Sequence, residues 1–139
     1  FNDGREERLL EYVRARFDQS CCDRSLEVLK LIDTFGTSEN YLMNVGEQKG
    51  SIVRELIARY KPKTMVEFGS YVGYSTVLFA TAVRDNGGSE YLSFERESKF
   101  EKVASAMVEL AELTNIVRFI SGPSSSNLVK EHKEGRLGQ

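Results

Sequence analysis

The chain has 139 residues, a formal net charge of −2, 40% hydrophobic residues and 29% charged residues, as expected for one soluble globular domain. This charge argues against nucleic-acid binding through a basic surface. The lack of an apolar run of about 20 residues, or of a signal-peptide pattern, argues against a membrane partner. Cys21 and Cys22 are adjacent and poorly placed to pair, so we expect a reduced, cytoplasmic protein without a zinc site.

Three amphipathic helices are predicted first, because apolar side chains recur every three or four positions. They cover residues 5–17, residues 26–36 with a glycine at the end, and residues 47–60. Pro62 follows the third helix and stops it, since proline removes a backbone donor and restricts the residue before it. Five side chains of this helix are expected to face inward, namely Ile52, Val53, Leu56, Ile57 and Tyr60.

After Pro62 the pattern changes to short apolar strands that alternate with helices. The predicted elements are a strand at 64–68, a helix at 74–83, a strand at 91–95, a helix at 98–113, a strand at 116–120 and a helix at 124–134. Three helices followed by β-α-β-α-β form the first half of a Rossmann-like, doubly wound α/β sheet with right-handed crossovers. We expect a single domain, with helices at 1–62 that form a cap and a ligand-binding half-sheet at 63–139.

The segment EFGSYVGYS, residues 67–75, joins the first predicted strand to the next helix. In such sheets ligands bind at the carboxyl ends of the strands, where this loop lies. Gly69 permits a sharp turn and a close approach of ligand to backbone, and Gly73 opens a helix whose free N–H groups suit an anion. The spacing is tighter than in G-x-G-x-x-G, which favours a carboxylate-bearing ligand over a pyrophosphate. Ser75 adds a hydroxyl donor, and Glu67 can accept from an ammonium group.

Glu95 ends the second predicted strand. In this architecture, an acid at that place accepts hydrogen bonds from both ribose hydroxyls. Taken alone, the glycine loop can also be no more than a tight strand-to-helix turn. Together with Glu95, it predicts a pocket for an amino-acid nucleoside.

Several segments together make the chain resemble the catechol O-methyltransferase family. They are EERLL at 6–10, IDTF at 32–35, MNVGEQKG at 43–50 and the loop at 67–75. The resemblance implies an S-adenosylmethionine-dependent O-methyltransferase with a Rossmann-like methyltransferase fold, of which this chain holds the N-terminal part without the C-terminal strands. It also implies magnesium as a second cofactor and a small-molecule substrate, a catechol or related vicinal diphenol.

The resemblance further implies roles for individual residues. The methionine end of the cofactor would lie against Val45, Glu67, Gly69, Tyr71 and Ser75. Glu95 would bind the ribose. The adenine would lie near Arg96, Gly122, Ser124 and Ser125. The aromatic substrate would be flanked by Tyr41 and Met43.

Three positions depart from the family pattern. Tyr41 stands where tryptophan is usual, Arg96 replaces the apolar residue that covers the adenine, and Ser125 stands where glutamine is usual. We therefore expect a substrate pocket of different shape and altered adenine contacts.

In the family, the metal ligands and the catalytic lysine follow the fourth strand, beyond Gln139. We therefore assign no catalytic and no metal-binding residue within this chain, and we expect the 139 residues alone to be inactive. The strand at 64–68 would be central in a complete sheet but is an edge here. We expect the chain to be part of a longer protein, or to dimerise through this exposed edge.

Two other functions are compatible with the sequence. A nicotinamide-dependent oxidoreductase of related fold is one, although the loop spacing argues against it. The other is a non-catalytic fragment or assembly module that retains the fold, which the missing metal ligands favour for this chain.

Overall fold

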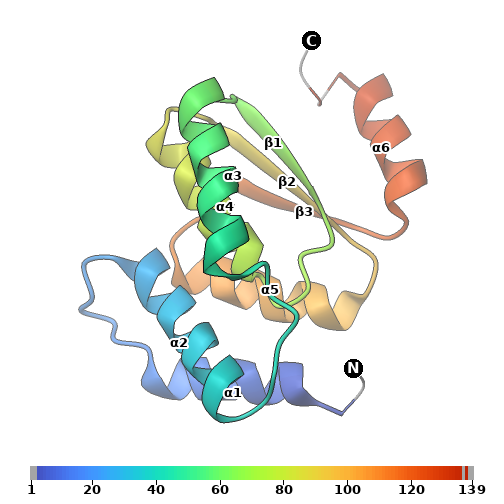
Figure 1. Ribbon diagram of the computed structural model, residues 1–139. Coiled ribbons are helices and arrows are strands. Elements are labelled where there is room, and N and C mark those ends of the chain that lie inside the picture. The colour runs from blue at the N-terminus through green and yellow to red at the C-terminus, as the bar shows by residue number, and fades with distance from the viewer. Residues whose placement is uncertain (1–2, 136, 138–139) are drawn as a thin grey trace.

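The structure is a computed structural model that describes residues 3–135 and 137. Its elements follow the predicted order (Figure 1). They are α1 (Arg5–Arg16), α2 (Arg24–Ser38), α3 (Gly46–Tyr60), β1 (Thr64–Phe68), α4 (Tyr74–Asp85), β2 (Glu90–Glu95), α5 (Ser98–Leu110), β3 (Val117–Ser121) and α6 (Ser124–Lys133). Within the described ranges, no helix is both long enough and apolar enough to span a membrane.

The three strands form a parallel sheet in the order β1-β2-β3. Phe68 pairs with Phe94, and Glu95 pairs with Ser121, so the carboxyl ends of all three strands meet at one edge of the sheet. Helices α4 and α5 pack on one face, while α6 is tied to the other by an ion pair of 2.9 Å between Arg118 and the buried Glu131. This is the predicted Rossmann-like arrangement, with β1 as an edge strand.

The main core lies between the sheet and the N-terminal helices. Helix α1 packs against α5, and α2 packs against α4. Fully buried side chains from both parts of the chain meet there, among them Leu9, Ile32, Val77 and Met107. Each such side chain contributes about 1.5–3 kcal/mol through its burial, so the N-terminal helices and the half-sheet stabilise one another.

Several helix ends differ from the predictions by one to three residues, and α2 and α5 show the local cause. Helix α2 continues past the glycine at 36 to Ser38. The Thr37 and Ser38 hydroxyls donate to backbone carbonyls one turn earlier and so add hydrogen bonds to the last turn of the helix. Helix α5 ends at Leu110 rather than at residue 113, because Glu112 adopts a φ of +55°, which no α-helix accommodates.

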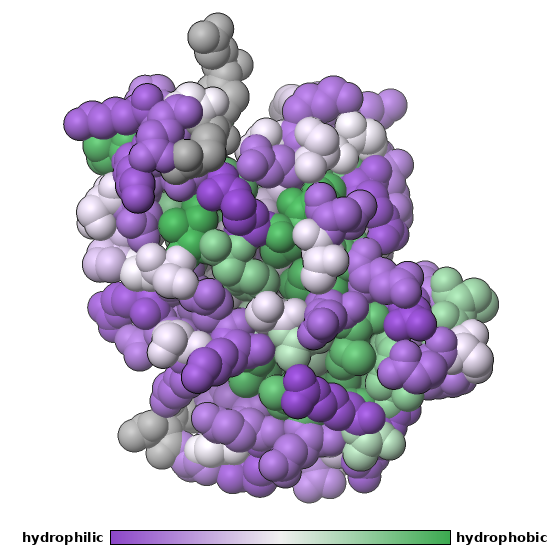
Figure 2. All heavy atoms as spheres, turned by 180° about the vertical axis from the view of Figure 1, so that it is seen from behind, coloured by the Kyte–Doolittle hydropathy of each residue, from purple (hydrophilic) through white to green (hydrophobic). Residues whose placement is uncertain are grey.

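The predicted inward face of α3 is wrong for three of its five residues. Ile57 is buried, but Ile52 is 59% exposed, Leu56 46% and Tyr60 71%. The reason is that α3 packs mainly against α4, which leaves this stripe of side chains exposed. Apolar side chains also reach the surface on the side of the molecule that faces away from the viewer in Figure 1. They lie between hydrophilic ones, toward the middle of the view (Figure 2).

Candidate functional site

Two glycines shape the loop that follows β1. Gly69 has a φ of +86° and Gly73 a φ of +88°, both in the left-handed region. A Cβ on Gly69 would meet nothing within 4 Å, so the backbone there is open to a ligand, as predicted. A Cβ on Gly73 would lie 2.9 Å from the Ala104 Cα, so this glycine also allows α4 and α5 to pack closely. The sequence indicated the turn but not this second requirement.

Tyr71, in the same loop, is held in an uncommon backbone conformation. Its φ is +48°, which costs a non-glycine residue about 1–2 kcal/mol. The hydroxyl donates to the Glu6 carboxylate on α1 at 2.9 Å, and the ring meets Phe100 edge-on at 5.1 Å between centroids. Burial, together with this bond to Glu6, raises the pKa of Tyr71. Sequence reasoning missed Glu6, because an acid in the first turn of a helix is usually on the surface.

The Glu95 carboxylate, at the end of β2, accepts hydrogen bonds from the loop that follows β1. Its Oε2 accepts hydrogen bonds from the backbone N–H groups of Ser70 and Tyr71, each at 3.0 Å, and from the Ser70 hydroxyl at 3.3 Å. Its Oε1 accepts from the Glu97 N–H at 2.9 Å. Glu95 is 6% exposed. Because a carboxylate has about four acceptor positions over two oxygens, Oε1 retains capacity for a ligand hydroxyl.

Glu67 is the centre of a hydroxyl cluster between the sheet and the first turn of α4. Its carboxylate accepts from Ser75 at 2.5 Å, from Thr76 at 2.6 Å and from Ser93 at 2.7 Å. Burial raises its pKa, and the three hydroxyls oppose that shift. The buried Tyr91 hydroxyl has no hydrogen-bond partner of good geometry, and burial and the Glu67 charge raise its pKa. Ser75 and Glu67, both predicted to face the ligand, here bond to each other.

A pocket of about 400 Å³ lies at the carboxyl ends of the strands. This volume is within the range of small-molecule sites. It is lined by Phe68, Gly69, Phe94, Glu95, Arg96, Gly122, Pro123, Ser124 and Ser125. Six of these were predicted as cofactor-binding residues, so the structure brings together the predicted ribose and adenine ends. The two phenylalanines were not predicted, because apolar residues at strand ends are usually part of the core.

The other predicted residues lie outside that pocket. Tyr41 and Met43 are exposed in the segment before α3, where the Tyr41 carbonyl accepts from the Arg5 guanidinium at 2.6 Å. Val45 is partly buried at the N-cap of α3. In the described part of the chain, no group of three or more His, Cys, Asp or Glu side chains could hold a metal ion. The described residues therefore offer no such cluster for magnesium, and no metal-dependent step is assigned to them.

Comparison with known proteins agrees with this architecture. A family model described as a methyltransferase domain matches residues 66–137, which is more than half of the chain. The chain therefore belongs to the methyltransferase-domain family. The predicted likeness to catechol O-methyltransferases is confirmed: the chain is 29% identical to catechol O-methyltransferase of Mus musculus over 130 residues, which cover 94% of this chain and 47% of that protein.

One further relative and one solved structure extend the comparison. The chain is 31% identical to a transmembrane O-methyltransferase homolog of Mus musculus over 113 residues, covering 81% of this chain and 43% of that protein. Its fold matches the O-methyltransferase of Bacillus cereus, solved in complex with SAH, with a TM-score of 0.65 at 20% identity over 91% of this chain and 55% of that chain. The chain thus spans about half the length of the relatives that it matches.

Proposed function

We propose that the protein carrying this segment is an S-adenosylmethionine-dependent O-methyltransferase, and that the pocket at the ends of β1, β2 and β3 binds its cofactor. One observation carries the proposal: the open backbone at Gly69 lies in the same pocket as the buried carboxylate of Glu95. This combination suits a ligand that approaches the main chain closely and also donates hydroxyl hydrogens.

The described residues bind and orient the ligand. Glu95 Oε1 would accept from the ribose, while Ser124 and Ser125 lie at the pocket wall where the adenine would sit. The first turn of α4 offers N–H groups to the cofactor's carboxylate. Arg96 is exposed at the rim and pairs with Glu97 at 3.3 Å, so its guanidinium can cover the adenine face by stacking. When bound, S-adenosylmethionine supplies the methyl group that is transferred.

A catechol-type acceptor and dependence on magnesium are the finer part of the proposal. They are supported by the family resemblance and by the names of relatives, with Tyr41 and Met43 flanking the acceptor. The metal ligands and the base are proposed to lie in the part of the methyltransferase fold that this segment does not span. The 139-residue segment alone is therefore proposed to be inactive, and its exposed β1 edge is proposed to pair with another segment or with a second copy. A cytoplasmic location is supported by the two unpaired cysteines.

Two measurements test this function on the protein in its full encoded length. Calorimetry with S-adenosylhomocysteine should show saturable binding at one site per chain. Transfer of labelled methyl to catechol should occur with magnesium and stop with a chelator. Absence of binding would overturn the cofactor assignment, while binding without transfer to catechol would overturn the acceptor assignment alone.

A further inference from the structure

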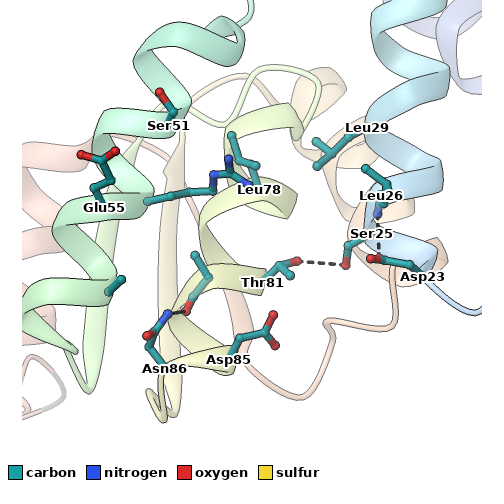
Figure 3. Close-up of a pocket in the computed structure, with 13 residues that line it drawn as sticks. Asp23, Ser25, Leu26, Leu29, Ser51, Glu55, Leu78, Thr81, Asp85 and Asn86 are labelled. Carbon is teal, nitrogen blue, oxygen red and sulfur yellow. Dashed lines mark hydrogen bonds between the residues drawn. The ribbon is translucent and has the colours of Figure 1, made fainter.

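A second groove lies on the outer side of α4, between α2 and α3 (Figure 3). It measures about 480 Å³ and shares no lining residue with the pocket at the strand ends. Helix α2 contributes Leu26 and Leu29, and α4 contributes Leu78 and Thr81. An adjoining hollow of about 260 Å³ continues the groove to Tyr74. Since α4 rises about 1.5 Å per residue, the groove follows it for about 18 Å.

The groove exists because α2 and α3 each pack on α4 rather than closely on each other. At the α3 side, Gly50 brings the two helices so close that a Cβ there would lie 2.7 Å from the Leu78 Cδ2. At the α2 side, the Thr81 hydroxyl donates to the Ser25 hydroxyl at 2.9 Å, a bond drawn in Figure 3. Both walls of the groove are therefore held against α4.

The groove has an apolar floor and acidic edges. Leu26 is 46% exposed in it, although leucine is usually buried. Seven charged residues line the groove and its continuation: Asp23, Asp33, Glu47, Glu55 and Asp85 against Lys30 and Arg54. Asp23 caps α2, and Asp85 forms an exposed ion pair with Arg84, but neither pairs with a base inside the groove. The surface thus combines the exposed Leu26 and the partly buried Leu78 with more acidic than basic side chains.

We propose that this groove docks a basic amphipathic helix of about 12 residues from a partner protein, the length that α4 offers. Its apolar stripe would lie on Leu26 and Leu78, and its Lys and Arg side chains would face Glu55 and Asp85. A helix satisfies its own backbone hydrogen bonds and needs only an apolar strip with charged flanks. Because acidic side chains outnumber basic ones in the groove, a basic helix is favoured over an acidic one. The assignment does not depend on the cofactor proposal, because the two sites share no residue.

The test uses the protein in its full encoded length and a labelled synthetic helix with leucines at three- and four-residue spacing flanked by lysines. Fluorescence anisotropy should show saturable binding that weakens as salt is raised. Glu55→Lys and Leu26→Ser should each weaken binding by about tenfold. Both positions are exposed, so the fold should persist, which thermal unfolding checks. Glu109→Lys on α5, outside the groove, is the matched charge control and should leave binding unchanged.

Three results would overturn the proposal. One is no saturable binding of the leucine–lysine helix. Another is an equal loss with Glu109→Lys, which would show general charge attraction. A third is self-association of the protein that Leu26→Ser abolishes, which would assign the groove to a second copy of this chain. Methyl transfer by the Glu55→Lys variant should equal that of the unmodified protein, since Glu55 does not line the cofactor pocket.

Discussion

Gly69 and Gly73 have similar φ angles but different surroundings, and single substitutions should separate their roles. Gly73→Ala adds a Cβ 2.9 Å from the Ala104 Cα in the left-handed region. The backbone cost and the overpacking should together lower the free energy of unfolding by about 2–4 kcal/mol. Urea denaturation measures this. The control is Gly87→Ala, with a similar φ of +85° but open space around it, which should cost only about 1–2 kcal/mol.

At Gly69 the same change should act on binding instead. Its Cβ would point into open space, so Gly69→Ala should destabilise the fold no more than Gly87→Ala does. The added methyl group, however, occupies the space where the ligand approaches the backbone. Calorimetry should show S-adenosylhomocysteine affinity reduced by about tenfold or more. Unchanged affinity would show that the ligand does not pass over this residue.

The Glu67 carboxyl gives a prediction about pH. Burial raises its pKa above the ordinary value of 4.5, so the folded protein holds this proton more tightly than the unfolded chain. The stability from this group is therefore fully present below about pH 4.5 and is lost as pH rises through the raised folded value. Relative to the unmodified protein, Glu67→Gln should gain stability as pH rises. Denaturation across a pH series measures the difference, and a constant difference would contradict the shift.

At the scale of elements, the bond between Tyr71 and Glu6 links α1 to the loop after β1. Tyr71→Phe removes the donor to a carboxylate that is 1% exposed. An unsatisfied buried acceptor of this kind should lower the free energy of unfolding by about 1–3 kcal/mol. A double-mutant cycle with Glu6→Leu, which removes the acceptor, should give a coupling energy of about 0.5–3 kcal/mol. Strict additivity of the two changes would show that the hydrogen bond adds nothing.

Element boundaries show where sequence patterns succeed and where they fail. Period-3.6 stripes predicted the helices, and short apolar runs after the Lys61-Pro62 break predicted the strands, in the order that the structure shows. The exposed stripe at Ile52, Leu56 and Tyr60 was mispredicted. Amphipathicity tells which face is apolar, but only the tertiary arrangement tells whether another element covers it.

For the whole molecule, the site was predictable to the extent that it lies in contiguous segments. Residues 67–75, Glu95 and residues 122–125 follow the three strands, and a parallel sheet necessarily brings its strand ends together. The hydrogen bonds between Glu95 and the loop after β1, and between Tyr71 and Glu6, join positions far apart in sequence. No spacing rule could have revealed them. The groove beside α4 was equally hidden, since it arises from the way two helices diverge over a third.

The hydrogen bonds of Glu95 make the two ends of the proposed cofactor pocket mechanically dependent on each other. One carboxylate fixes the amides that shape the methionine end and lines the pocket where the ribose would lie. A loop held in this way needs little ordering when its ligand arrives, so less binding energy is lost to entropy. A shift of the ribose would therefore also move the methionine end, because the Oε1 that would accept from the ribose and the Oε2 that accepts from the loop amides belong to one carboxylate.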